Sequence, residues 1–169
     1  PQLPGNAIRE IVPDQYGNLW LGTEDNGINC YNPSTGQITN YSYNNPKHPL
    51  SATNIHGLLA DGNRLWVGTY NKGIDVLDIP SGKIIKHYSR ESTDHPLNDN
   101  FILCFYKTRN DEFLIGTGSG IMAYNSRTET FSRWNNIYAL IRQIYEDSNG
   151  DIWAATANGI YHYLRETNT

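Results

Sequence analysis

Four stretches of this 169-residue chain share one pattern, and that pattern decides the fold. They read DQYGNLWLGTEDNGI (14–28), DGNRLWVGTYNKGI (61–74), RNDEFLIGTGSGI (109–121) and DSNGDIWAATANGI (147–160). A threonine follows a small residue in every copy, at spacings of 46, 48 and 39 residues; these threonines are Thr23, Thr69, Thr117 and Thr156. Spacings of this size are typical of propeller blades or of helical arrays.

The composition favours strands over helices. The chain contains 15 Gly and 12 Tyr, whereas charged residues make up only 18% of it. Aromatic and β-branched side chains fill pleated surfaces and Gly supplies turns, whereas a helical array would carry more Ala, Leu, Glu and Lys. We therefore expect an all-β fold, a β-propeller fragment of about four blades of four antiparallel strands. The last blade is expected to lack its outer strand.

Each copy is expected to supply four strands in order from the propeller axis outward. An apolar pair three residues apart marks the innermost strand; the pairs are Ile8 and Ile11, Ile55 and Leu58, Ile102 and Phe105, and Ile141 and Ile144. The second strand carries a large flat side chain that fills the wedge between blades; these residues are Trp20, Trp66 and Trp153, with Leu114 in the third copy. The outer strands are expected at 38–41, 84–88 and 130–134.

Glycine recurs at two positions of the repeat, and we interpret both as structural. The first precedes the repeated threonine, where a missing side chain allows close backbone approach; it is held by Gly22, Gly68 and Gly116, with Ala155 in the fourth copy. The second ends the turn into the third strand; it is held by Gly27, Gly73, Gly120 and Gly159.

An aspartate precedes the second strand in three copies, at Asp14, Asp61 and Asp147, and Thr108 replaces it in the third. Their common position in the repeat argues against a catalytic acid. We interpret them as turn residues whose side chains accept hydrogen bonds from the backbone that follows.

The repeats are expected at 7–41, 54–88, 101–134 and 140–169, within one partial propeller domain spanning 1–169. The chain does not begin with Met, and Met122 is its single Met, so we expect it to be a piece of a longer protein. Its two outermost blade faces would then be apolar and unpaired. We expect them to pack on the remaining blades of the parent chain or on a second copy, as a homo-oligomer.

Several kinds of chemistry lack their sequence signals. The net charge is −4 without a basic cluster, so no nucleic-acid contact is expected, and no apolar run is long enough for direct membrane insertion. The glycine-rich stretch 116–120 lacks the Lys-Ser/Thr ending of a phosphate loop, and no G-x-S-x-G elbow occurs.

Cys30 and Cys104 are expected to be small buried apolar residues. His48 and His95 recur in the linkers and are interpreted as structural. We expect no catalytic residue, no metal site and no cofactor.

Ligand contacts are expected where the repeats differ, because the shared positions hold the fold. Tyr70, Asn71 and Lys72 replace the residues 24–26 of the first copy in the equivalent turn, and Trp134 ends an outer strand. An aromatic ring beside hydrogen-bonding groups suits a sugar. The alternative is that these are ordinary surface and blade-edge residues.

The full pattern is apolar-x-x-apolar-x-x-Asp-x-x-Gly-x-apolar-Trp-x-Gly-Thr, followed by Gly-Ile and an aromatic residue. It resembles the two-component regulator propeller repeat, most clearly over 8–31 and 141–163. The second copy shortens the Asp turn, and the third lacks both the Asp and the Trp. The Asp-box of sialidase-like propellers fits less well, because its Asp and Gly are one residue closer together.

The resemblance implies the periplasmic sensor region of a Bacteroides-type hybrid two-component histidine kinase whose parent protein is anchored in the inner membrane. Such sensors typically recognise an oligosaccharide and signal to a kinase that lies outside this chain, so the chain itself is not expected to be an enzyme. Two alternatives stay open: a propeller scaffold for protein–protein interaction, and part of a secreted carbohydrate-active propeller enzyme.

Overall fold

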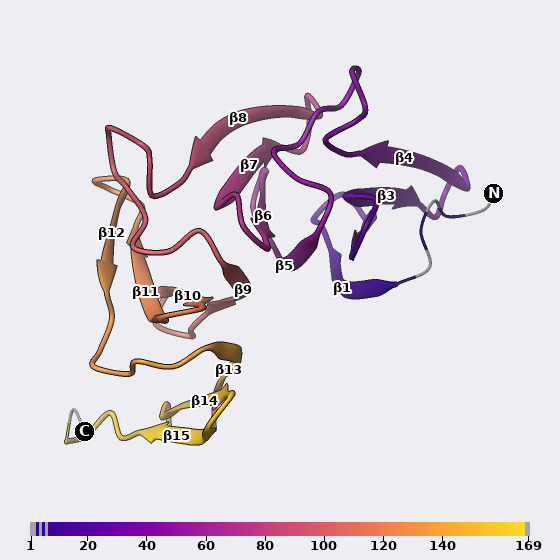
Figure 1. Cartoon of the computed structure of the whole chain (residues 1–169). Coiled ribbons are helices and arrows are strands. Elements are labelled where there is room, and N and C mark those ends of the chain that lie inside the picture. Colours follow the sequence, from indigo (N-terminus) through magenta and orange to yellow (C-terminus); the bar gives the residue numbers. More distant parts are fainter. Residues whose placement is uncertain (1–2, 4, 6, 168–169) are drawn as a thin grey trace.

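The computed structural model describes residues 3, 5 and 7–167, which form four antiparallel sheets (Figure 1). The first sheet contains β1 (Ile8–Pro13), β2 (Leu19–Thr23), β3 (Ile28–Asn32) and β4 (Gln37–Tyr41). The second contains β5 (Ile55–Asp61), β6 (Arg64–Thr69), β7 (Ile74–Asp78) and β8 (Lys83–Tyr88). The third contains β9 (Ile102–Lys107), β10 (Phe113–Thr117), β11 (Gly120–Asn125) and β12 (Thr130–Arg133). The fourth contains β13 (Ile141–Glu146), β14 (Ile152–Thr156) and β15 (Gly159–Tyr163).

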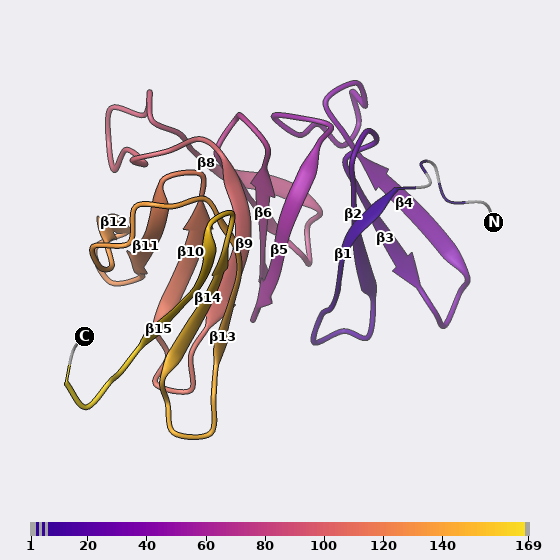
Figure 2. The same ribbon diagram turned by 60° about the horizontal axis from the view of Figure 1, so that its bottom comes forward.

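Each sheet is a meander whose strands pair in chain order, so each is a propeller blade. The blades stand side by side in an arc, with β1, β5, β9 and β13 along its concave side and β4, β8 and β12 along its outside (Figures 1 and 2). Consecutive inner strands pack against one another along this concave side. The predicted all-β fold, with four blades and a three-stranded last sheet, is confirmed.

Three apolar clusters hold the arc together, one at each junction between consecutive blades. The face that carries the repeated tryptophan, or Leu114 in the third blade, is here termed the exit face. In the first three blades it packs on the opposite or entrance face of the next blade. At the second junction, Trp66 and Val76 of the exit face meet Phe113, Ile115 and neighbouring side chains of the third blade's entrance face. Trp20 and Trp66 are both only 2% exposed, as the wedge-filling role predicts.

The small residue before each repeated threonine allows this close packing. A Cβ placed on Gly22 would lie 3.1 Å from Ile55 Cγ2, and one placed on Gly116 would lie 2.9 Å from Ile141 Cγ2. In both cases the neighbour is the first apolar residue of the next inner strand. A side chain at these positions would clash, but the groups that approach them are side chains rather than the backbone that the sequence predicts.

The aspartate turns follow the prediction in the first and fourth blades. Asp14 Oδ1 accepts the backbone N–H groups of Tyr16 and Asn18, and Asp14 Oδ2 accepts Trp20 Nε1–H at 2.8 Å. Asp147 does the same in the fourth blade, where its Oδ2 lies 2.9 Å from Trp153 Nε1. Burial opposes ionisation of Asp14, but hydrogen bonds from Asn18 and Trp20 outweigh it and lower the pKa.

The prediction is wrong for Asp61. This residue is the last of β5 and pairs directly with Arg64 across a two-residue turn, so its side chain has no following turn backbone to bond. Its carboxylate instead accepts Lys107 Nζ from the next inner strand at 2.7 Å. Trp66 Nε1 is consequently buried with no acceptor among the described residues.

The repeated threonines fasten the turn that follows each second strand. Thr69 Oγ1 donates to the Gly73 carbonyl and accepts the Lys72 N–H, both at 2.9 Å. The same pair of bonds is made by Thr23, Thr117 and Thr156. Gly73 has φ of 79°, a conformation that glycine adopts without strain. The turn that holds Tyr70, Asn71 and Lys72 is therefore fixed at both ends.

Both cysteines are free thiols. Cys104 is buried, as predicted, whereas Cys30 is only partly buried. Burial raises the pKa of Cys104 to about 12 and that of Cys30 to about 11, so both are protonated at neutral pH.

Candidate functional site

Each inner strand contains one extra residue at the same place. The pairing of β1 with β2 skips a residue between Ile8 and Glu10, and β5, β9 and β13 skip one at the equivalent point. The extra residues of these four β-bulges are Arg9, His56, Leu103 and Arg142. A bulge re-aims the side chain that it carries. All four line one cavity, which we term the axial cavity, on the concave side of the arc.

The axial cavity has a volume of about 740 Å³, within the range of small-molecule sites. The inner strands also contribute Glu10, Gln143 and Tyr145 to its wall, and the adjoining turns contribute Tyr70 and Phe101. Its floor is therefore the repeated inner-strand framework, whereas its surface chemistry comes from positions at which the repeats differ.

An aromatic cluster stands on one wall of the axial cavity. The Tyr70 ring lies 4.3 Å from the Phe101 ring and 5.3 Å from the His56 ring, measured between centroids. Tyr70 remains 44% exposed, and its backbone N–H donates to the Asn54 carbonyl, which fixes it beside the start of β5. An exposed ring supported from behind is the kind of surface on which a sugar ring stacks.

The ionisable groups of the cavity have different environments. Arg9 forms an ion pair with Glu24, which is on the turn of its own blade. Burial, together with the nearby positive charge of Arg9, lowers the pKa of His56, so its imidazole is neutral at pH 7. Burial also raises the pKa of Glu10. The fourth of these groups, Arg142, is exposed.

Of the four predicted ligand contacts, three lie together. Asn71 and Lys72 line a shallower pocket of about 300 Å³, and Tyr70 lines both this pocket and the axial cavity. Trp134 is elsewhere, partly buried at the outer side of the third junction. Its ring packs on Tyr163 at 4.7 Å, and its Nε1 lies 3.4 Å from a carboxylate oxygen of Glu112.

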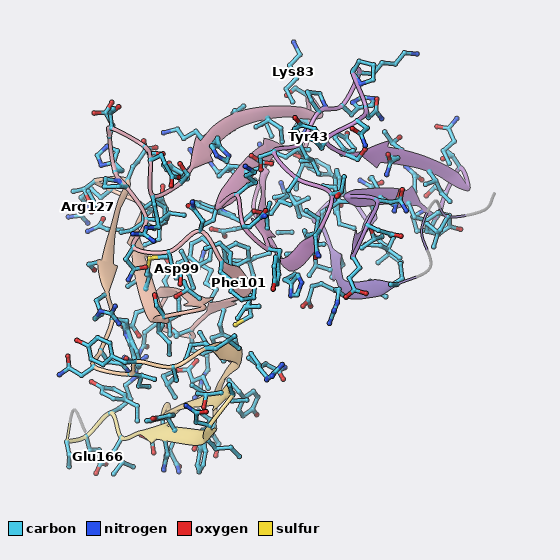
Figure 3. All side chains as sticks on the ribbon, in the orientation of Figure 1. Tyr43, Lys83, Asp99, Phe101, Arg127 and Glu166 are labelled. Atoms are coloured by element: carbon cyan, nitrogen blue, oxygen red, sulfur yellow. The ribbon has the colours of Figure 1, made fainter. Side chains whose placement is uncertain are left out.

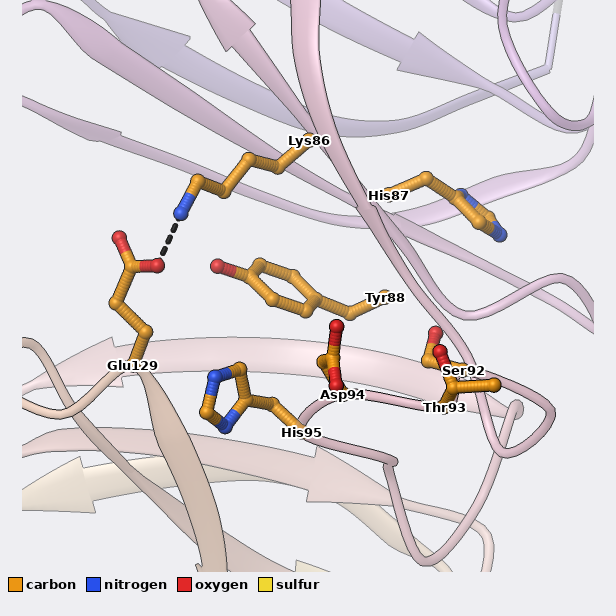
Figure 4. Close-up of a pocket in the computed structure, with 8 residues that line it drawn as sticks. All are labelled: Lys86, His87, Tyr88, Ser92, Thr93, Asp94, His95 and Glu129. Carbon is orange, nitrogen blue, oxygen red and sulfur yellow. Dashed lines mark hydrogen bonds and ion pairs between the residues drawn. The ribbon is translucent and has the colours of Figure 1, made fainter.

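A second hollow, of about 480 Å³, lies between the outer parts of the second and third blades (Figure 4). Lys86 of β8 and Glu129, just before β12, form an ion pair across it, which lowers the pKa of Glu129. Tyr88 packs beneath this pair against Phe131, with 4.9 Å between ring centroids. Because the Lys86–Glu129 pair and the Tyr88–Phe131 packing join the two blades, we interpret this hollow as part of the contact between them.

Asp147, Asp151 and His162 also approach one another, with one potential ligand atom of each within 4.8 Å of the others. Each has a structural role. Asp147 closes its turn, Asp151 accepts the Arg165 N–H at 2.8 Å, and the His162 ring stacks on Trp153 at 3.8 Å.

The four bulge residues line the cavity but are not predicted as ligand contacts from the sequence. A signal for them exists, because the apolar pair of each inner strand is three residues apart. Side chains alternate along a regular strand, so residues three apart face opposite sides. Ile55 and Leu58 nevertheless pack in the same cluster, which requires one extra residue between them.

Comparison with known proteins agrees with this architecture. The family model described as two component regulator propeller matches residues 2–25 and 134–158. These segments are two-component regulator propeller repeats. The chain is 35% identical over 172 residues to Histidine kinase P4 of Formosa agariphila, an alignment that covers 94% of this chain and 12% of that protein. The chain thus spans about an eighth of the curated relative that it matches.

Solved structures are similar over the whole chain. An extracellular domain from B. thetaiotaomicron, described as part of a hybrid two component system, superposes with a TM-score of 0.83 and 27% identity, covering 100% of this chain and 24% of that one. Virginiamycin B lyase of Staphylococcus aureus superposes with a TM-score of 0.69 and 21% identity, covering 99% of this chain and 56% of that one, and shares the fold alone. The described residues include no helix long and apolar enough to cross a bilayer.

Proposed function

We propose that this chain is part of the periplasmic ligand-sensing region of a hybrid two-component histidine kinase anchored in the inner membrane. The observation that carries the proposal is the superposition on the extracellular domain from B. thetaiotaomicron, together with 35% identity to a histidine kinase. The alignments cover 12% of the histidine kinase and 24% of the extracellular domain, which supports a proposal in which the kinase activity belongs to other parts of a longer polypeptide.

The ligand we propose is an oligosaccharide bound in the axial cavity. Tyr70 and Phe101 offer a ring surface, while Gln143, Arg142 and Glu10 supply hydrogen-bonding groups that line the same cavity. Oligosaccharides present apolar ring faces and hydroxyl edges, and a wall of this composition complements both. The bulges fix the cavity side chains on rigid strands, which favours recognition by a preformed site.

The test is calorimetric titration of the full sensor region with oligosaccharides from plant and host glycan digests. Tyr70→Ala should weaken the binding of any active oligosaccharide at least tenfold. Tyr138→Ala is the matched control, because Tyr138 is 71% exposed and packs on Arg133 outside the cavity. Unchanged affinity in Tyr70→Ala would remove Tyr70 from the site, and the absence of binding to every digest would contradict the sensing proposal itself.

A further inference from the structure

The fold admits different residue types at the four bulge positions of the axial cavity. The strand ladder passes over each extra residue, and the four positions hold three residue types: arginine at Arg9 and Arg142, histidine at His56 and leucine at Leu103. The residue before each bulge is isoleucine in all four described blades, and it is 0% exposed in the second, third and fourth, at Ile55, Ile102 and Ile141. The chemistry of the bulge side chains therefore reports what the cavity binds rather than what the blades need.

Three of the bulge side chains are already accounted for within the chain. The charge of Arg9 is balanced by Glu24. The neutral ring of His56 packs with Tyr70 and Phe101, and Leu103 adds apolar surface beside them. These residues form the part of the cavity that suits an uncharged sugar ring.

Arg142 differs from the other three. It comes from β13, lines the axial cavity, and forms no hydrogen bond or ion pair with another residue in the part of the chain that the structure describes. Its guanidinium is permanently charged and presents donors in a planar fork that matches a carboxylate or sulfate. Among the described residues, the carboxyl side chain that lines the cavity is Glu10, whose pKa is raised by burial.

We infer that the axial cavity selects an acidic oligosaccharide, whose carboxylate or sulfate pairs with Arg142 while a neighbouring sugar ring packs on Tyr70 and Phe101. This inference rests on the proposed function and narrows its ligand class. In this arrangement, the aromatic wall of the second and third blades binds the sugar ring, and Arg142 of the fourth blade binds the anionic group.

The experiment uses the full sensor region and an oligosaccharide digest separated by anion exchange into a neutral and an acidic fraction. We expect binding from the acidic fraction, with affinity that falls as salt concentration rises. Arg142→Gln should weaken this binding at least tenfold, and Arg142→Lys should retain part of it, because the charge remains but the fork is lost. Reduction of carboxyl groups in the acidic fraction distinguishes the two anions, since it abolishes binding through a carboxylate and spares binding through a sulfate.

The matched control is Arg127→Gln. Arg127 lies on the turn between β11 and β12, at the outer edge of the arc and far from Phe101 (Figure 3), and its substitution should leave affinity unchanged. Binding of the neutral fraction with equal affinity, or full affinity in Arg142→Gln, would overturn the inference and leave the sensing proposal standing. No binding from either fraction would overturn both.

Discussion

Ile102, the first residue of β9, lies directly over Gly68 in the neighbouring blade, and a Cβ on Gly68 would come within 2.6 Å of its Cγ2. Gly68 precedes Thr69 in the repeated Gly-Thr pair, and Ile102 is 0% exposed in the second junction. The second and third blades can approach this closely because Gly68 has no side chain and the Ile102 side chain fills the space. Equivalent pairs occur at both other junctions, which makes this contact the repeating unit of the arc.

Gly68→Ala should destabilise the chain by about 1–3 kcal/mol, because the added methyl overpacks a filled junction. The measurement is the free energy of unfolding from urea denaturation. Ile102→Ala removes the opposing Cγ2, so Gly68→Ala should cost less in that background, and the double-mutant cycle should give a coupling energy above about 0.5 kcal/mol. Additive costs would show that the methyl is accommodated elsewhere.

The tryptophans offer a second comparison. Trp20 Nε1 donates to Asp14, whereas Trp66 Nε1 is buried without an acceptor among the described residues. Trp20→Phe should therefore cost about 1–3 kcal/mol more than Trp66→Phe, because it removes a hydrogen bond to a charged acceptor in addition to ring volume. Both variants lose the same indole atoms, so each controls for the other in urea denaturation. Equal costs would assign no stabilising role to the Asp14–Trp20 bond.

The fold was largely predictable from the sequence because each blade repeats the same local rules. Trp20 and Trp66 mark the exit faces, and the small residues before the threonines mark the junctions. The prediction for Asp61 was wrong because the turn after it is shorter, and its carboxylate accepts a hydrogen bond from Lys107 on the next blade instead of from the turn backbone. The shorter turn is visible in the sequence, but the new partner lies 46 positions away and has no local signal.

The candidate site was predicted only in part. Tyr70 could be found because it departs from the repeat, and it does reach the axial cavity. Arg142 was not found, because a residue inside a strand is normally assigned to one face by alternation, and the bulge breaks that alternation. Trp134 also departs from the repeat, but its ring is engaged by Tyr163 at the third junction. A departure from the repeat therefore indicates a residue that the blade fold does not require, but it does not show whether the side chain lies in the cavity or at a junction.

The second blade contains a pH-sensitive contact. His87 Nδ1 lies 2.7 Å from Asp75 Oδ1, and Asp75 is buried and also accepts the Ser51 N–H at 2.8 Å. The hydrogen bond to Asp75 raises the pKa of His87 above its ordinary value. The contact therefore adds stability in full below about pH 6.5, the ordinary histidine pKa, and this is lost as pH rises through the raised value in the folded chain.

We expect the stability difference between the chain and His87→Asn to shrink between pH 5.5 and pH 8. Because the His87 side chain is 41% exposed, solvent screening limits the change to about 1 kcal/mol or less. The measurement is urea denaturation at both pH values, with a histidine NMR titration to locate the pKa. Asn is a suitable replacement because the first blade pairs Asn29 with Asn40 at the same position. A pH-independent difference, or an unshifted His87 titration, would contradict this assignment.

The entrance face of the first blade predicts how the isolated chain behaves in solution. Ile11 is 55% exposed, whereas its counterpart Leu58 is 3% exposed, because Leu58 is covered by the exit face of the preceding blade. Ile8 is likewise 37% exposed, and its counterpart Ile55 is 0% exposed. Apolar surface that the other blades bury is thus open to solvent here, and burying it is worth about 25 cal/mol per Å².

We expect the isolated chain to self-associate through this face, with a mass that rises with concentration in multi-angle light scattering. Ile11→Lys should shift the association toward monomer, since a charge there would have to be desolvated in the interface. Ile85→Lys is the matched control, because Ile85 is 47% exposed on the outer strand β8, away from the entrance face of the first blade. A monomer at every concentration would exclude self-association, and an equal effect of both substitutions would mean that general solubility, rather than this face, governs it.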